Sequence, residues 1–239
     1  MYGWRARIGR ISPSPETAGA EEWRRSLPEG VCLVETRTLV HDVTAEGLAE
    51  MVTQVERAAS ELASARVDLI LQAGTAAAFF RGLGHDRELI QRITSLTKIP
   101  ATTTLTAVVE ALRALGVRRV AVATPYLPEM DAKLGEVLRQ SGFEIAGMKG
   151  LGLRRSIDMG DLRPEAAYRL AREVARAAPD ADGILVSCGN LRTFEIIEPL
   201  ETDTGLPTVT SNQAGLWQAL RLTGVEDRLA GLGRLLADH

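Results

Sequence analysis

Short apolar runs rich in valine and isoleucine alternate along the chain with longer stretches in which apolar residues recur at helical spacing. Short apolar runs bounded by turn residues predict buried strands, and a 3.6-residue period predicts amphipathic helices. Strands that alternate with helices are typical of an α/β fold built on parallel sheets. The pattern predicts eight strands, at residues 6–11, 31–38, 67–72, 100–103, 119–123, 144–150, 183–187 and 207–210.

The stretches between these runs predict helices. Helix-start residues occur at 42–44 and 161–164, and Gly116 and Gly224 follow helical stretches where a glycine commonly ends a helix. The predicted helices cover residues 44–63, 87–96, 105–115, 130–141, 164–177 and 213–222.

An internal repeat decides between one closed barrel and two open sheets. Residues 67–75 resemble residues 181–189, and residues 99–104 with 111–117 recur as 206–211 with 219–225. Chance similarity between βα units does not readily produce both matches in the same order. The repeat therefore predicts two similar domains that face one another, with Gly74 and Cys188 on opposite sides of a shared cleft.

Cys188 is the main candidate for chemistry. It follows the apolar run 183–186 and precedes Gly189, which places a thiol at the carboxyl end of a parallel strand, where ligands bind in open α/β sheets. A helix that begins there would lower the thiol pKa and hold an anion. The alternative is a buried structural cysteine, but the repeat and the following glycine favour a site for a small carboxylate.

Other candidate residues also follow predicted strands. Gly74 permits close backbone approach in the equivalent turn of the first half, and Thr75 offers a hydroxyl. Tyr126 lies beyond the strand at 119–123, where a phenol can stabilise an anionic intermediate, the alternative being an exposed loop tyrosine. Residues 11–15, which include Pro13, and Asn212 are expected to line the same cleft.

Composition limits the class of protein. A hydrophobic fraction of 45% and a charged fraction of 25% are typical of a globular protein. The net charge is −3 and the basic residues form no stripe, so we expect no nucleic-acid partner. The sequence has no signal-peptide pattern and no run of ~18 apolar residues, so we expect a cytoplasmic protein without a membrane partner.

The cysteines and histidines indicate neither a disulfide framework nor a metal site. Cys32 lies within a predicted strand and is interpreted as core packing, which leaves Cys188 as the reactive thiol. The three histidines, His41, His85 and His239, are scattered, and no cluster has metal-ligand spacing. We therefore expect no metal and no other cofactor.

Three segments together resemble the aspartate/glutamate racemase superfamily. They are residues 112–126, the pair Gly74-Thr75 and the triplet 187–189, and the similarity runs through nearly the whole chain. The branch concerned holds maleate cis-trans isomerases, ectoine-utilisation isomerase-like proteins and arylmalonate decarboxylases. The resemblance implies two pseudo-symmetric Rossmann-like or flavodoxin-like domains, each with a parallel four-stranded sheet. It further implies domain limits at residues 1–101 with 211–239, and at residues 102–210.

The single cysteine site resembles the arylmalonate decarboxylase branch, because isomerases and racemases of the superfamily place one cysteine in each half and this chain has Gly74 in the first. The resemblance implies a cofactor-free decarboxylase of an arylmalonate-type acid. Thr75, Tyr126 and backbone N–H groups near Ala76 and Gly189 would hold one carboxylate. The other would leave an apolar pocket as CO2, and Cys188 would protonate the enediolate.

Departures from that branch leave other functions open. Ala76 lacks a hydroxyl that the decarboxylases use, and Arg154, Arg155 and Ser156 make the pocket region more polar. The resemblance also implies Pro13, Val40, Val43, Met159 and Arg155 as substrate-binding residues. The alternatives are a maleate isomerase, an Asp/Glu racemase-like enzyme or a degenerate carboxylate-binding relative. The expected ligand is a small carboxylate or dicarboxylate, and the oligomeric state stays open.

Overall fold

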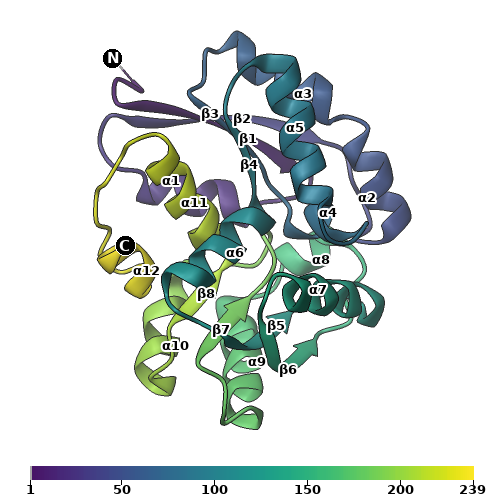
Figure 1. The fold of residues 1–239 in the computed structure, drawn as a ribbon, viewed down its shortest axis with the longest axis vertical. Coiled ribbons are helices and arrows are strands. Elements are labelled where there is room, and N and C mark those ends of the chain that lie inside the picture. The colour runs from purple at the N-terminus through teal and green to yellow at the C-terminus, as the bar shows by residue number, and fades with distance from the viewer. Residues whose placement is uncertain (1) are drawn as a thin grey trace.

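The computed structural model describes residues 2–239, and these residues form two parallel sheets of four strands each (Figure 1). The first sheet has the order β2-β1-β3-β4 and the second has the order β6-β5-β7-β8, so the two halves share one topology. The repeat in the sequence is thereby confirmed. The strands are β1 (Ala6–Pro13), β2 (Val31–Thr38), β3 (Leu69–Gln72), β4 (Ala101–Thr103), β5 (Arg119–Thr124), β6 (Glu144–Gly150), β7 (Gly183–Val186) and β8 (Thr208–Thr210).

Burial along the strands follows their place in the sheets. Every residue of the inner strands β3 and β7 is buried, which is typical of parallel sheets with helices on both faces. Most residues of the edge strands β2 and β6 are only partly buried. Cys32 lies on β2 and is half-buried, so it does not belong to a core as the sequence suggested.

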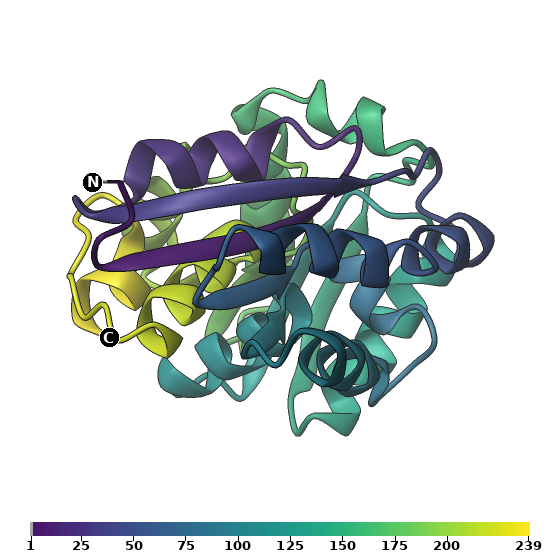
Figure 2. The ribbon, with the colours of Figure 1, turned by 90° about the horizontal axis from the view of Figure 1, so that it is seen from above.

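Helices cover both faces of each sheet. Figure 2 shows β1 and β2 side by side, with α1 on one face and α3 on the other. The helices are α1 (Ala18–Ser26), α2 (Ala45–Val52), α3 (Val55–Ser64), α4 (Thr75–Phe79), α5 (His85–Thr97), α6 (Thr104–Ala114), α7 (Pro128–Gln140), α8 (Ser156–Gly160), α9 (Pro164–Ala177), α10 (Ile197–Thr204), α11 (Ser211–Leu222) and α12 (Gly233–Asp238), with a 3-10 turn η1 (Phe194–Ile196).

The predicted helix at residues 44–63 is two helices in the structure. Thr53 ends α2, and its hydroxyl donates to the carbonyl of Glu50 at 2.6 Å. Gln54 binds the backbone of Leu39 in both directions, at 2.9 and 3.0 Å. This long-range pairing fixes the break between α2 and α3, and the apolar period of the sequence does not reveal it.

The predicted helix ends are confirmed. The Thr44 hydroxyl caps α2 by accepting from the backbone of Gly47, and Pro164 is the first residue of α9. Gly116 and Gly224 have φ values of 70° and 74°, a left-handed conformation that favours glycine after a helix.

The two halves join through the helices that follow β4 and β8. These helices, α6 and α11, pack against each other, and each also contacts the sheet of the other half (Figure 1). The Trp23 indole on α1 donates to the carbonyl of Asn212 on α11 at 2.9 Å. The domain limits at residues 101 and 211 stay a prediction, because the helices that begin near these limits, α6 and α11, pack against each other.

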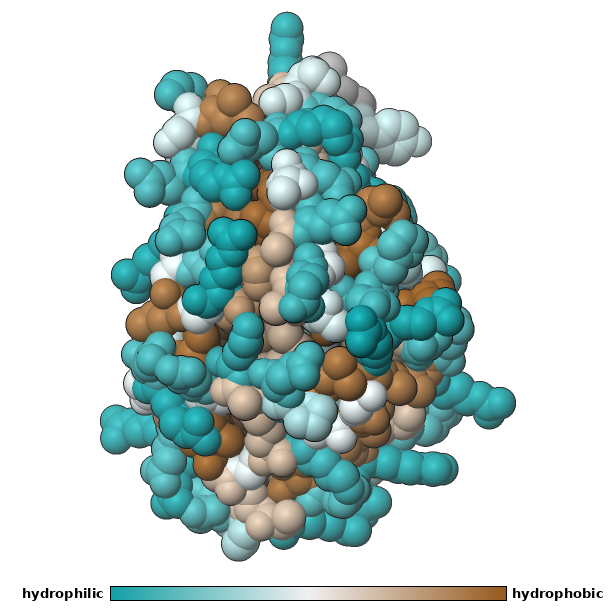
Figure 3. Space-filling model, turned by 90° about the vertical axis from the view of Figure 1, so that its right-hand side faces the viewer, coloured by the Kyte–Doolittle hydropathy of each residue, from teal (hydrophilic) through white to brown (hydrophobic). Residues whose placement is uncertain are grey.

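Apolar side chains on the face drawn in Figure 3 lie in small groups among hydrophilic ones. The large apolar residues that are exposed are also far apart in the chain, such as Trp4, Leu83 and Leu222. None of the helices within residues 2–239 combines the length and apolar character needed to cross a bilayer.

Candidate active site

The carboxyl ends of the inner strands of both sheets meet at one cavity of about 40 Å³. Pro13 ends β1, Gly74 follows β3, Tyr126 follows β5 and Cys188 follows β7, so each sheet contributes through equivalent strands. The wall comprises Pro13, Glu16, Val40, Val43, Leu48, Met51, Gly74, Thr75, Ala76, Ala77, Tyr126, Ser156, Met159, Cys188, Gly189 and Asn190. A wider hollow of about 570 Å³ lies near α1 and Arg192 but does not contain the thiol.

Cys188 is 6% exposed and faces this cavity as a protonated thiol. Burial raises its pKa to about 12, against the opposing effect of the Asn190 backbone N–H, which donates to Sγ at 3.4 Å. The expected lowering of the pKa by a helix N-terminus is wrong. No helix begins at Gly189, and the next α-helix starts only at Ile197. The side chain is therefore suited to give a proton rather than to attack as a thiolate.

Gly74 adopts a backbone conformation that favours glycine. Its φ is +91°, and a Cβ built on it would lie 3.2 Å from Cγ of Pro13 and 3.8 Å from Cε of Met51. A side chain here would be strained by the backbone and crowded by Pro13. The residue lets α4 begin at Thr75, directly beside the cavity.

Hydroxyl groups from both halves meet behind the thiol. Oγ1 of Thr75 and Oγ of Ser211 lie 2.8 Å apart, and Ser211 accepts the backbone N–H of Cys188 at 3.0 Å. Tyr126 is 2% exposed, so it is not an exposed loop residue. Burial, reinforced by nearby Cys188, raises its pKa well above the ordinary value, so its phenol keeps the proton. Thr75 and Tyr126 thus place hydroxyl groups on the cavity wall.

One side of the cavity is apolar. Its wall includes Val40, Val43, Leu48, Met51 and Met159, all of them buried. They come from the loop before α2, from α2 itself and from α8. Their apolar atoms cannot solvate a charge, so a carboxylate held against them is destabilised.

Two loops from opposite halves close over the cavity, and we name them the clasp: residues 39–44 and 151–156. The backbone N–H of Val43 donates to the Arg154 carbonyl at 2.8 Å, and that of Ser156 to the His41 carbonyl at 3.1 Å. The Arg154 guanidinium also donates to Asp42 at 2.8 Å. Val40, Val43 and Ser156 of the clasp line the cavity.

Arg155 does not line the cavity, contrary to the sequence expectation. Its side chain is 64% exposed and lies 4.0 Å from Asp158 on the first turn of α8. Its backbone forms a bridge with Asp42, so the residue belongs to the clasp. The other sequence-predicted substrate-binding residues all lie on the cavity wall, while their roles stay predictions.

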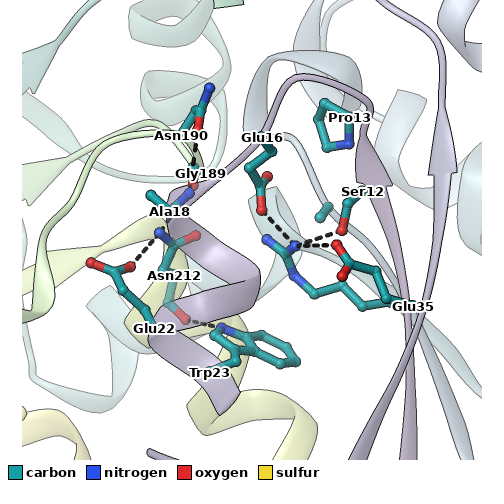
Figure 4. A network of polar contacts seen from close by, with 12 residues as sticks. Ser12, Pro13, Glu16, Ala18, Glu22, Trp23, Glu35, Gly189, Asn190 and Asn212 are labelled. Atoms are coloured by element: carbon teal, nitrogen blue, oxygen red, sulfur yellow. Dashed lines mark hydrogen bonds and ion pairs between the residues drawn. The ribbon is translucent and has the colours of Figure 1, made fainter. Parts of the chain in front are cut away.

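Asn212 lies behind the cavity wall. Its amide donates to the carbonyl of Gly189 at 3.0 Å and to the buried carboxylate of Glu22 at 2.6 Å (Figure 4). Asn190 holds the same turn from the other side, because its side chain accepts from Thr17 and donates to Ser156. The turn after Cys188 is therefore fixed by amides.

Sequence reasoning missed one charged residue of the wall, Glu16. It follows the Ser-Pro segment 12–15, whose polar, proline-rich composition is typical of an exposed turn. The available signal was its partner, because Arg10 lies between Ile8 and Ile11 in strand β1 and a buried arginine needs a carboxylate. Among residues 2–239, no group of three or more His, Cys, Asp or Glu side chains could hold a metal ion.

Comparison with known proteins gives concordant matches. The family model described as arylmalonate decarboxylase matches residues 29–236. Arylmalonate decarboxylase of Bordetella bronchiseptica is 36% identical over 229 residues, covering 95% of each chain. Maleate isomerase of Nocardia farcinica is 30% identical over 240 residues, covering 96% of this chain and 95% of its own.

Solved structures agree with these sequence matches. The liganded Gly74Cys-Cys188Ser mutant of arylmalonate decarboxylase superposes with a TM-score of 0.91 at 32% identity, over 96% of this chain and 98% of its own. A Nocardia farcinica maleate cis-trans isomerase mutant with a covalently bound succinylcysteine intermediate superposes with a TM-score of 0.93 at 27% identity, over 98% and 99%. The chain belongs to the arylmalonate decarboxylase family.

Proposed function

We propose that this protein is a cofactor-independent carboxy-lyase that decarboxylates an arylmalonate-type, disubstituted malonic acid and protonates the product through Cys188. The observation that carries the proposal is the asymmetry of the cavity. Among the described residues, Cys188 is the one thiol on the wall, and the equivalent turn of the other half has Gly74. One thiol can protonate one face of a planar intermediate, whereas racemisation requires a second proton-handling group on the other face.

The proposed reaction divides the two carboxylates between two environments. One carboxylate accepts hydrogen bonds from Thr75, Tyr126 and neighbouring backbone N–H groups, while the other lies against the apolar wall. Its C–C bond breaks, CO2 leaves, and the electron pair forms an enediolate on the remaining carboxylate. The Cys188 S–H then gives its proton to the α-carbon, and the thiolate regains a proton from water.

The protonation state of Cys188 supports this role over nucleophilic attack. A nucleophilic cysteine needs a lowered pKa, whereas burial raises that of Cys188 to about 12. The Nocardia farcinica isomerase structure carries a succinylcysteine, a product of bond formation to sulfur. A buried neutral thiol is less suited to that step and well suited to transfer a proton to a carbanion.

Maleate isomerisation is the second candidate function. Asn190 and Ser156 add polar groups to the cavity wall, and the 30% identity to a maleate isomerase covers nearly the whole chain. A cavity of about 40 Å³ also suits a small acid, since a single water needs roughly 10–15 Å³. A bulky aryl group would require the clasp to open.

Incubation of the purified protein with methyl-phenylmalonate and, separately, with maleate distinguishes the two functions. The proposal expects CO2 release and one enantiomer of the monocarboxylate from the first compound, and no fumarate from the second. Cys32→Ser should retain this activity, because Cys32 lies on an edge strand away from the cavity. Fumarate formation without CO2 release would contradict the proposal.

A further inference from the structure

The carboxyl group of Glu16 is buried on the cavity wall, and within residues 2–239 its Oε2 contacts no hydrogen-bond donor. The residue is 1% exposed and follows β1 in the turn that faces Cys188 and Gly189. Oε1 forms an ion pair with Nη1 of Arg10 at 2.5 Å. Neither carboxyl oxygen has a hydrogen-bond partner of good geometry within residues 2–239. A buried polar oxygen without a donor is costly, so the arrangement calls for a ligand.

The Oε2 atom of Glu16 is directed toward Gly189, the residue that follows Cys188. A Cβ placed on Gly189 would lie only 3.0 Å from Oε2, and Gly189 directly follows Cys188 in the chain. Figure 4 shows the Glu16 carboxyl group near Gly189, and its dashed contact is the ion pair with Arg10. Oε1 is thus engaged by Arg10, while Oε2 is the oxygen available to a bound molecule.

Charged groups around Glu16 act on its ionisation in opposite directions. Arg10 lies between Glu16 and Glu35, and Arg37 contacts both of them, through the Glu16 backbone carbonyl at 2.7 Å and the Glu35 carboxylate at 3.1 Å. Burial, with the charge of Glu35 adding to it, raises the pKa of Glu16 above its ordinary value, and Arg10 and Arg37 oppose only part of that shift. Arg10, Arg24 and Arg37 thus place three guanidinium groups around Glu16 and Glu35, and the ion pair with Arg10 favours the carboxylate form of Glu16, in which Oε2 is a hydrogen-bond acceptor.

We propose that Glu16 accepts a hydrogen bond from the substrate, which therefore carries a donor group, a hydroxyl or an ammonium, on or beside the carbon that bears the carboxylates. This inference rests on the proposed function for the malonate-type core of the ligand. A substituent without a donor leaves Oε2 buried and unpaired. A site built to bind such a donor discriminates strongly against an analogue that lacks it.

The test compares ligands of nearly equal size by isothermal titration calorimetry on the full chain. Hydroxymalonate and aminomalonate provide a donor where methylmalonate has a methyl group, and Cys188→Ser protein prevents turnover during the titration. We expect both donor-bearing acids to bind about tenfold or more tightly than methylmalonate. Tighter binding of aminomalonate identifies an ammonium group as the preferred donor, and tighter binding of hydroxymalonate identifies a hydroxyl.

Two further substitutions in the same background assign the preference to Glu16. In Glu16→Gln the amide oxygen pairs with Arg10 and leaves an N–H donor on the cavity side, so the preference for aminomalonate should disappear, whereas the hydroxyl of hydroxymalonate can accept from that N–H. Glu35→Gln is the matched control, because Glu35 contacts the same arginine but does not line the cavity, and it should retain the preference.

Equal binding of hydroxymalonate, aminomalonate and methylmalonate would overturn the inference even if Glu16→Gln does not fold. A preference for aminomalonate over methylmalonate that survives in Glu16→Gln would overturn it too. Failure of the proposed function has a different signature. Absence of CO2 release from wild-type protein contradicts decarboxylation and leaves the equilibrium preference measurable.

Discussion

The turn after β3 and the turn after β7 occupy equivalent places in the two halves but are built differently. In the first half, Gly74 has a left-handed φ of +91° and α4 begins at the next residue. In the second half, Cys188 is followed by a turn held by Asn190 and Asn212, and the next α-helix begins only at Ile197. The two equivalent turns thus place the Thr75 hydroxyl and the first N–H groups of α4 on one side of the cavity. They place the Cys188 thiol on the other side.

The largest expected effect comes from replacing Cys188, the proposed proton donor in the turn after β7. Cys188→Ser should lower kcat by about 10³-fold, because a serine hydroxyl is a much weaker acid than a thiol and general acid catalysis contributes roughly 10² to 10⁴. CO2 release and circular dichroism together measure activity and folding. Cys32→Ser is the control, and a Cys188→Ser protein with near-normal turnover would contradict a proton donor role.

Removing the Tyr126 hydroxyl, the proposed hydrogen-bond donor near the turn after β3, should have the next largest effect. Tyr126→Phe should lower kcat by about 10²-fold, since loss of one oxyanion donor costs that much in other enzymes. The ring contact with Phe79, at 6.0 Å between centroids, is retained, so stability should change little. Tyr168→Phe is a matched control, because Tyr168 binds Asp203 far from the cavity.

The second turn should also be sensitive to pH through Glu22, whereas the first has no equivalent. Glu22 accepts from Thr193, Phe194 and Asn212, and burial outweighs these bonds and raises its pKa from 4.5 to about 7. A carboxyl with a raised folded-state pKa stabilises the fold at low pH. That stabilisation is complete below pH 4.5 and is lost as pH rises through 7.

Comparison with Glu22→Gln isolates this contribution. Between pH 4.5 and 7, the unfolding free energy of wild type should fall relative to the variant by about 3 kcal/mol, from urea unfolding at each pH. A constant difference across this range would show that Glu22 does not titrate as described. Exposed Glu21→Gln, on the same helix, should show no such trend.

The smallest expected effect concerns the clasp that joins the halves. Asp42→Asn removes an exposed ion pair with Arg154, and such pairs contribute little, so stability should hardly change. Because a looser clasp admits larger ligands, KM for methyl-phenylmalonate should fall slightly while kcat is unchanged. Asp180→Asn removes a comparable exposed pair with Arg119 and should leave KM unchanged.

The sequence predicted features that depend on local pattern and missed those that depend on packing between halves. Strand ends follow from short apolar runs, which is why Gly74, Tyr126 and Cys188 were correctly placed at carboxyl ends. The break after Thr53 depends on a contact of Gln54 with Leu39, which no periodicity encodes.

The chemistry of individual side chains shows the same limit. The direction of the Cys188 pKa shift was wrong, because burial and not a helix terminus controls it. Arg155 lies in the expected loop, but pairing between loops turns its side chain outward. Glu16 was missed because only its contact with Arg10 distinguishes it from a residue of an exposed turn.

The most direct test of the central claim is the product's handedness when the thiol is moved between the two turns. Gly74→Cys combined with Cys188→Ser should convert methyl-phenylmalonate to the opposite enantiomer from wild type, measured by chiral chromatography. The rate should be reduced, because a side chain at φ +91° is strained and lies 3.2 Å from Pro13. Formation of the wild-type enantiomer by this double variant would contradict protonation by Cys188 across a cleft shared with residue 74.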